Sequence, residues 1–332
     1  MNSLVDRFGR KITYLRLSVT DRCDLRCSYC MAENMTFLPK QDVLSLEELE
    51  SLADSFIRRG IRKIRITGGE PLVRKDIMLL LEKLGKRVKS GELEELVITT
   101  NGTQLSKYAA QLKMFGVKRL NVSLDTLNPV LFEKLTRRSA LTSVLQGIEA
   151  ALKIGLKIKI NTVALKNCND AEIPKIMQWS HERGMDMTLI EVMPMGEIDI
   201  DRIDQYLPLS VVRDRLEADF TLQDIDKQTG GPARYVKVRE TGGVLGLITP
   251  LTNNFCAGCN RVRVTCTGQI YSCLGHSGAI DLRAALRGDN SKGRIDALLD
   301  QVMLKKPERH SFDISKRGAV PAVSRHMSTT GG

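Results

Sequence analysis

Aromatic residues are scarce in this sequence: they make up 5% of 332 residues, with a single tryptophan. Proteins that hold single-stranded nucleic acid stack bases on aromatic side chains, so this scarcity argues against that class. Long apolar runs are also missing, because the longest extends only from Ile77 to Leu81, far short of a membrane span. The first residues carry charges with no apolar stretch between them, which predicts neither a secretion signal nor an anchor, and a cytoplasmic protein is expected.

Positive charge, in contrast, is in excess. Fifty Lys and Arg against 39 Asp and Glu give a net charge of +11, and residues 256–332 hold 12 basic and 6 acidic side chains, or +6. A basic excess concentrated in one part predicts an anionic partner, which is nucleic acid, a membrane surface or a phosphorylated small molecule. Hydrophobic residues at 42% and charged residues at 27% are otherwise typical of a globular protein.

Short β-branched segments alternate with longer amphipathic ones over the first two-thirds of the chain. The first amphipathic segment follows Ser45, a candidate helix cap, and ends at Gly60. Six strand–helix units in a row predict a parallel α/β sheet, either open or closed into a partial or complete barrel. The expected strands are Thr13–Val19, Lys63–Thr67, Glu95–Thr99, Lys118–Ser123, Lys157–Thr162 and Met187–Glu191.

The alternation of strand and helix patterns ends at about Pro194. Residues 196–208 are rich in Asp, Gly and Pro and are expected to form a loop. Short alternating segments then predict a smaller, mainly antiparallel region appended to the α/β core. Its expected strands are Tyr235–Arg239, Val244–Ile248, Arg261–Thr265 and Gln269–Cys273.

Eight cysteines are many for a cytosolic chain, where clustered thiols more often bind metal or perform redox chemistry than form disulfides. Three of them follow the first expected strand at spacing i, i+4 and i+7: Cys23, Cys27 and Cys30. Thiolate-only ligation favours zinc or an iron–sulfur cluster. A four-iron cluster held by three thiolates leaves one iron open to an exogenous ligand, whereas a structural zinc site would need a distant fourth residue.

A second set of three cysteines lies near the carboxyl end: Cys256, Cys259 and Cys273. Zinc is a strong rival here, because His276 or Cys266 would complete a four-ligand site, and spacing does not decide. Arg261 and Arg263 fall on one face of the expected strand between these cysteines. Guanidinium groups suit phosphate, so this strand is a candidate anion site.

The segment Cys23-Asp-Leu-Arg-Cys27-Ser-Tyr-Cys30 resembles the CxxxCxxC signature of the radical S-adenosylmethionine (SAM) superfamily, and Thr67-Gly-Gly-Glu-Pro71 after the second strand agrees with it. The resemblance implies that an open iron binds SAM and that one electron cleaves it to a 5′-deoxyadenosyl radical. It implies SAM contacts at Tyr29, Gly69, Ser123 and Met193, although a methionine such as Met193 is more commonly core packing.

Two further features narrow the resemblance to the GTP 3′,8-cyclase family: the run Cys256-Ala-Gly-Cys259-Asn-Arg-Val-Arg263 and the closing Gly331-Gly332. Enzymes of this family catalyse the first step of molybdenum cofactor biosynthesis. That family implies a second 4Fe-4S cluster that holds the guanine of GTP. It implies (8S)-3′,8-cyclo-7,8-dihydroguanosine 5′-triphosphate as the product and a catalytic tail that includes Gly331 and Gly332. The implied GTP contacts are Arg16, Lys63, Arg65, Thr99, Lys159, Arg261, Val262 and Arg263.

The same resemblance implies a partial parallel (βα) barrel of about six strands in residues 1–195 and a C-terminal extension, residues 196–332, that closes it. The implied partners are GTP, an electron donor such as flavodoxin or ferredoxin, and molybdenum cofactor biosynthesis protein C as the next enzyme. A homodimer is compatible with it, and no nucleic acid or membrane is expected. Thr188 departs from relatives that carry arginine there. The alternatives are a peptide-modifying radical SAM maturase and a zinc-stabilised nucleic-acid-binding protein.

Overall fold

The computed structural model describes residues 3–31, 34–196, 202–252, 255–312 and 323–331. Their strands form one twelve-stranded sheet in the order β12-β11-β10-β1-β2-β3-β4-β5-β6-β9-β8-β7. The eight central strands are all parallel: β10 (Arg261–Val264), β1 (Tyr14–Ser18), β2 (Lys63–Thr67), β3 (Glu95–Thr100), β4 (Arg119–Ser123), β5 (Lys157–Ala164), β6 (Asp186–Glu191) and β9 (Val244–Ile248). The outer strands are antiparallel to their neighbours: β11 (Gln269–Tyr271), β12 (Ala279–Asp281), β8 (Arg234–Val238) and β7 (Leu222–Ile225).

The parallel α/β prediction is confirmed for β1 to β6, which lie side by side in chain order and begin and end within two residues of the expected bounds. The sheet nevertheless holds twelve strands in the described residues rather than about six. The later strands do not form one separate region, because β9 extends the sheet beyond β6 and β10 extends it beyond β1, both in parallel. Alternating periodicity marks a segment as a strand but does not reveal which strand it pairs with. The sequence therefore predicted a separate antiparallel region, whereas β9 and β10 join the parallel sheet.

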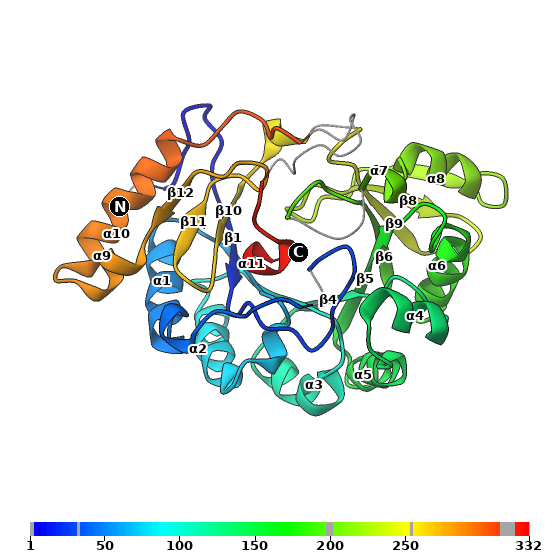
Figure 1. Cartoon of the computed structure of the whole chain (residues 1–332), viewed down its shortest axis with the longest axis horizontal. Helices are drawn as coiled ribbons and strands as arrows, with labels where there is room; N and C mark the ends of the chain where they lie inside the picture. The colour runs from blue at the N-terminus through cyan, green and yellow to red at the C-terminus, as the bar shows by residue number, and fades with distance from the viewer. Residues whose placement is uncertain (1–2, 32–33, 197–201, 253–254, 313–322, 332) are drawn as a thin grey trace.

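Helices cover the outer face of the curved sheet (Figure 1). Those between the first six strands are α1 (Leu46–Arg58), α2 (Ile77–Lys89), α3 (Leu105–Met114), α4 (Pro129–Thr136), α5 (Leu141–Lys153) and α6 (Ile173–Glu182). The expected cap is present, because the Ser45 side chain accepts from the Glu48 backbone and the Glu48 carboxylate accepts from the Ser45 backbone. Gly60 follows α1 with φ +92, a conformation that favours glycine at a helix end.

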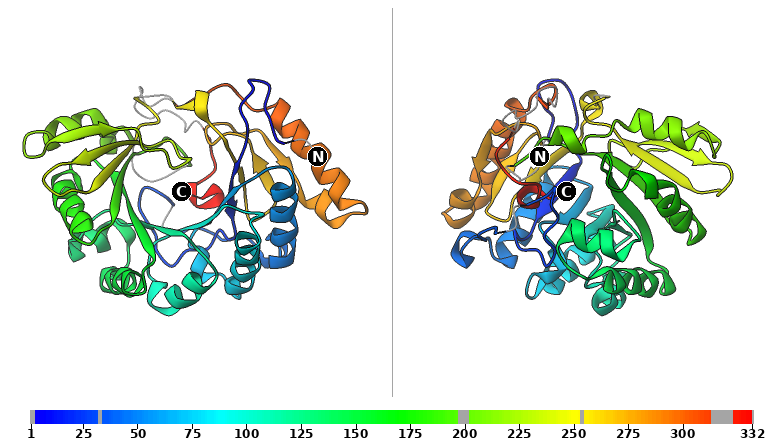
Figure 2. Two further views of the ribbon diagram at one scale, coloured as in Figure 1. Left: turned by 180° about the vertical axis from the view of Figure 1, so that it is seen from behind. Right: turned by 45° about the vertical axis from the view of Figure 1, so that its right-hand side comes forward.

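The remaining helices belong to the second half of the chain: α7 (Arg202–Gln205), α8 (Leu209–Leu216), α9 (Arg283–Arg287), α10 (Ser291–Leu304) and α11 (Met327–Thr330). The expected loop at 196–208 therefore contains the short α7, whereas residues 197–201 lie outside the described part. Two views show α11 inside the curve of the sheet, on the opposite side of β1 from the outer helices (Figures 1 and 2). Among the described residues, no helix is both long and apolar enough to cross a bilayer.

Candidate active site

The first pocket lies where the parallel strands end, and it gathers the amino-terminal cysteine set. Its lining includes all seven residues that the resemblance assigned to the first cluster and SAM: Cys23, Cys27, Tyr29, Cys30, Gly69, Ser123 and Met193. Burial raises the pKa of Cys23 to about 12, and the nearby carboxylate of Glu70 adds to this effect. A thiolate here consequently needs a cation, so this donor set fits a metal cluster.

Glycines after β2 allow the cysteine-bearing loop to cross the end of that strand. A Cβ on Gly68 would lie 2.5 Å from the Thr20 carbonyl oxygen, and one on Gly69 would overlap the Arg22 carbonyl and approach the Asp21 carbonyl oxygen to 2.8 Å. The Gly-Gly pair is therefore required by backbone packing against the segment that leads into Cys23.

Glu70 fixes the neighbouring strand end. Its fully buried carboxylate accepts from the Leu72 backbone (2.9 Å), the Thr100 hydroxyl (2.9 Å) and the Asn101 backbone (2.6 Å). Asn101 in turn donates through Nδ2 to Cys23 Sγ (3.7 Å). The end of β3 is thereby tied both to the glycine turn and to the cysteine loop. Burial raises the pKa of Glu70 to about 7.

Tyr29 and Asp125, which both line the first pocket, form a hydrogen-bonded pair. The tyrosine hydroxyl donates to Asp125 Oδ2 (2.5 Å), and Asp125 Oδ1 accepts from the Val163 backbone (2.8 Å). Burial raises the pKa of Asp125 to about 6. Sequence reasoning did not single out Asp125, although it ends the Asn121-Val-Ser-Leu-Asp125 segment that carries Ser123.

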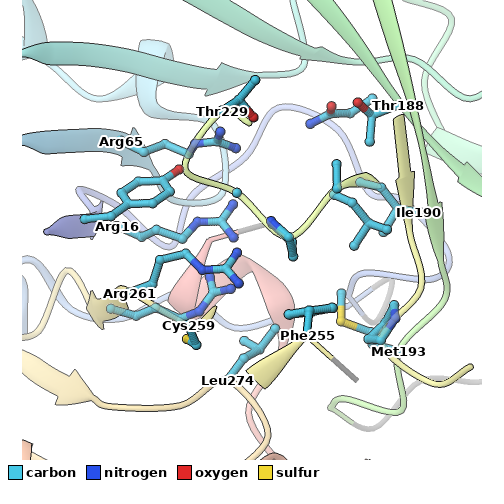
Figure 3. A pocket seen from close by; sticks show the side chains of 18 of the residues that line it. Arg16, Arg65, Thr188, Ile190, Met193, Thr229, Phe255, Cys259, Arg261 and Leu274 are labelled. Carbon is cyan, nitrogen blue, oxygen red and sulfur yellow. The ribbon is translucent and has the colours of Figure 1, made fainter. Parts of the chain in front are cut away.

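The second pocket adjoins the first and is strongly cationic. Six of its lining side chains are basic: Arg16, Arg65, Arg119, Lys159, Arg261 and Arg263. No Asp or Glu of the described residues lines it. Figure 3 shows Arg16, Arg65 and Arg261 projecting into it from one side, with Thr188 and Ile190 opposite. The pocket region holds about 1120 Å³ of space, including space open to solvent.

Three of these arginines occupy one register row on adjacent strands. Arg16 of β1 lies directly opposite Arg65 of β2 on one side and Arg263 of β10 on the other. Burial, together with the neighbouring cations, lowers the pKa of Arg16 well below its usual value and that of Arg263 to about 9. Like charges directly opposite one another are destabilising, so this row requires a polyanion to offset the repulsion.

Lys159 extends the cationic wall onto β5. Its Nζ donates to the Tyr235 hydroxyl (2.7 Å), and burial, with Arg119 and Arg65 nearby, lowers its pKa to about 7. Thr188, on the next strand, lines the same pocket, and its buried hydroxyl has no hydrogen-bond partner among the described residues. The departure from an arginine at this position therefore leaves a polar atom available to a ligand.

The second cysteine set lies in this cationic pocket, which Cys256, Cys259 and Cys273 all line. Burial opposes ionisation of Cys259, but Arg261 and Lys306 nearby lower its pKa to about 7, so the structure favours a thiolate. Neither proposed zinc ligand joins them: Cys266 lines neither pocket, and His276 Nε2 is bonded to the Arg309 carbonyl (3.0 Å). Within the described ranges, no three His, Cys, Asp or Glu side chains are arranged about a single metal ion.

Three of the expected GTP contacts do not line the second pocket. Lys63 pairs with Glu95 (2.5 Å) and donates to the Thr229 carbonyl (3.0 Å), and it does not line the second pocket. Thr99 lines the first pocket and accepts from Arg65 Nη1 at 3.4 Å. Val262 points into the core, with 1% of its surface exposed. Alternation along β10 explains Val262, because its neighbours Arg261 and Arg263 face the pocket.

The carboxyl-terminal segment lies between the two pockets. Both are lined by Asn161, Ile190, Met193 and Met327, the last of which begins α11. Gly331 has φ +74 and accepts from Arg263 Nη1 (3.0 Å), while Gly332 lies outside the described residues. The hydroxyls of Ser328 and Thr330 are buried without a partner in the described chain, so α11 presents unsatisfied polar atoms inside the curve of the sheet.

Two basic residues of this site escaped the sequence analysis. Arg119 alternates with Asn121 along β4 and lines the second pocket, but the family resemblance that implied Arg16 and Arg65 did not single it out. Lys306 follows α10 and is 2% exposed, yet its Nζ lies 3.6 Å from Cys259 Sγ. No local pattern could have identified Lys306, since its role depends on a contact between distant segments.

A parallel sheet with three cysteines beyond its first strand, next to a glycine turn, defines a radical SAM protein, and the Radical SAM superfamily model matches residues 17–180. The fold is shared with the SAM-bound crystal structure of Streptococcus suis SuiB, at TM-score 0.62 and 16% identity, covering 89% of this chain and 68% of that one. The Molybdenum Cofactor Synthesis C model matches residues 185–312.

Closer relatives identify the family. The GTP 3′,8-cyclase of Sinorhizobium medicae is 62% identical over 99% of this chain and 95% of its own length, and that of Rhizobium meliloti is 63% identical over 99% and 94%. The chain belongs to the GTP 3′,8-cyclase family.

Proposed function

We propose that the protein is a GTP 3′,8-cyclase, which uses SAM to convert GTP into (8S)-3′,8-cyclo-7,8-dihydroguanosine 5′-triphosphate, the first step of molybdenum cofactor biosynthesis. One observation carries the proposal: two adjoining pockets each gather three cysteines, and only one of them is lined by six basic side chains with no described carboxylate. The first pocket suits a cluster and SAM, and the second suits a triphosphate. Relatives about 60% identical over nearly the whole chain bear this name.

The first pocket would hold a 4Fe-4S cluster on Cys23, Cys27 and Cys30. When bound, this cluster and SAM supply the 5′-deoxyadenosyl radical that removes hydrogen from C3′ of the ribose. The chain's own contribution is positioning. Asn101 restrains the Cys23 thiolate, and Tyr29 is held by Asp125 against the pocket wall. Residues shared by both pockets would keep the two ligands adjacent, which supports a ribose position near the first pocket.

The second pocket would hold a second 4Fe-4S cluster on Cys256, Cys259 and Cys273, with the guanine beside it. Arg16, Arg65 and Lys159 face the lumen and are proposed to bind the triphosphate. The tail helix α11 covers the boundary between the pockets and excludes water from the reacting carbons. A peptide-modifying function has no comparable support, because a peptide would leave the arginine row without counter-charge.

The proposal includes a division of labour along the chain. Residues 1–195 form the SAM-binding barrel, and residues 196–332 supply the second cluster and the Gly-Gly tail that closes the barrel. The partners would be GTP, a flavodoxin or ferredoxin as electron donor and molybdenum cofactor biosynthesis protein C as the next enzyme, in the cytoplasm. We also propose that the chain forms a homodimer.

The test is an anaerobic assay of the reconstituted protein with GTP, SAM and dithionite. We expect about eight irons per chain, equal yields of 5′-deoxyadenosine and cyclised nucleotide, and no product with GTP omitted. Cys168→Ser is the matched control, because Cys168 lines neither pocket, and it should retain activity. About two zinc ions per chain and no cyclised nucleotide would refute the proposal.

A further inference from the structure

A buried lysine lies directly beneath the second cysteine set. Lys306 follows α10, and its Nζ donates to Cys259 Sγ (3.6 Å), the Arg261 carbonyl (3.1 Å) and the Ser272 carbonyl (2.5 Å). None of these partners is a carboxylate, and Lys306 forms no ion pair with any residue that the structure describes. Burying an ammonium group without an opposite charge is costly, so its counter-charge must be on the thiolate side.

Two arginines support the other cysteines of this set. Arg10 Nη1 donates to the Cys256 carbonyl (2.8 Å), and Arg325 Nη2 donates to the Cys273 carbonyl (3.4 Å). Arg10 is itself paired with Asp6 (2.6 Å), whereas Lys306 reaches a sulfur atom directly. Lys306, Arg10 and Arg325, the cationic cradle, therefore come from three distant segments and attach one cation to each cysteine.

The first cysteine set has different surroundings. The donor to Cys23 Sγ is the neutral amide of Asn101, whose Nδ2 is also bonded to the Asp24 carboxylate (2.7 Å). The buried Glu70 accepts from the Asn101 backbone on the same side. The first set also has a cation at its backbone, because Arg26 Nη1 donates to the Cys23 carbonyl (2.5 Å). The two sets differ at sulfur, where the donor to Cys23 Sγ is a neutral amide and the donor to Cys259 Sγ is an ammonium group. Net charge and hydrogen bonds to the sulfurs are the protein's means of setting an iron–sulfur reduction potential.

We propose that Lys306 is a positioning residue of the second cluster, whose charge and N–H···S hydrogen bond to Cys259 stabilise the reduced cluster and raise its reduction potential above that of the first. This inference rests on the proposed function, since it requires the second cluster. Because of its higher reduction potential, the second cluster would accept a donated electron that SAM does not use.

The experiment uses the full chain with Cys23, Cys27 and Cys30 changed to alanine, so that only the second cluster gives a signal. Its midpoint potential is measured by titration with dithionite, followed by electron paramagnetic resonance. Lys306→Gln keeps an N–H donor but removes the charge, and Lys306→Met removes both. Lys305→Gln is the matched control, because Lys305 is the adjacent, exposed lysine.

We expect Lys306→Gln to weaken the preference for the reduced state about tenfold, a potential about 59 mV lower, with a larger shift in Lys306→Met and none in Lys305→Gln. Loss of iron from both Lys306 variants at an unchanged melting temperature would also support the proposal. Equal potentials in Lys306→Gln and Lys305→Gln would overturn it, as would unfolding of both Lys306 variants. If the parent chain holds no cluster there, the proposed function fails, and this inference fails with it.

Discussion

Replacing Gly331 by alanine tests whether the docked tail is needed for the reaction. The new Cβ would overlap the Thr67 methyl and hydroxyl groups and lie 2.7 Å from Thr67 Cβ, at a backbone φ of +74. The left-handed conformation costs about 1–2 kcal/mol for a residue with a Cβ. Displacement of the tail also takes the Gly331 carbonyl from Arg263, a charge-assisted hydrogen bond contributing about 1.5–3 kcal/mol.

The backbone strain and the overlap with Thr67 both weaken docking of the tail, whereas the hydrogen bond from Arg263 opposes its displacement. The strain alone corresponds to a factor of roughly 5 to 30. Gly331→Ala should therefore form cyclised nucleotide at least about fivefold more slowly while still producing 5′-deoxyadenosine, because the cysteine sets are untouched. The assay counts both products in the same reaction. A rising ratio of 5′-deoxyadenosine to cyclised nucleotide would show that radical formation has become uncoupled from the nucleotide.

Gly242→Ala is the matched control for this substitution. Gly242 has φ +67, and a Cβ there would meet no atom within 4 Å, so the variant carries the backbone strain without the overlap. It should retain the parental product ratio. If Gly331→Ala and Gly242→Ala gave the same ratio as the parent, the docked tail would have no part in the reaction.

Three further expectations concern the clusters, the phosphate wall and its protonation. Cys27→Ala should abolish cleavage of SAM, whereas Cys259→Ala should retain some cleavage and lose cyclised nucleotide; normal product from Cys259→Ala would contradict two separate clusters. Arg65→Ala should weaken GTP binding roughly 10- to 150-fold in calorimetry, and Lys63→Ala much less, because Lys63 is turned toward Glu95 and the Thr229 carbonyl; equal losses would place Lys63 in the phosphate site. The pKa of Lys159 near 7 means that its charge is present below that pH and lost above it, so GTP affinity should fall as pH rises from 7 to 8.5, and Lys159→Met should flatten this dependence.

Local patterns in the sequence were sufficient for six strands of the central sheet, whereas most of the candidate site residues were implied by the family resemblance. The strands β1 to β6 are runs of β-branched residues between amphipathic helices, so period and length mark them unambiguously. The placement of β9 and β10 at opposite edges could not be inferred, since pairing depends on three-dimensional contacts. The short strands β7 and β12 were not predicted from the sequence.

Side-chain direction was the other limit. Lys63 and Arg65 alternate with the same parity on β2, and the sequence treats them alike, yet only Arg65 reaches the pocket. Lys63 lies at the beginning of the strand, where Glu95 on β3 is its register partner and neutralises it. The position of a residue along its strand decides whether its side chain reaches the pocket. This position relative to the pocket depends on the whole curved sheet and has no sequence signature.

The attachment of β10 to β1 has a consequence for how the chain is made. Synthesis proceeds at about 5–20 residues per second, so the roughly 250 residues between these strands take about 12–50 s to emerge. The other side of the parallel core waits far less, because β9 follows β6 by roughly 60 residues, or about 3–12 s. Throughout this longer wait the edge of β1 has no partner, so its backbone groups are a template for intermolecular pairing. Ribosome-bound chains that end before residue 255 should therefore aggregate through β1, and this edge is where a chaperone would be needed.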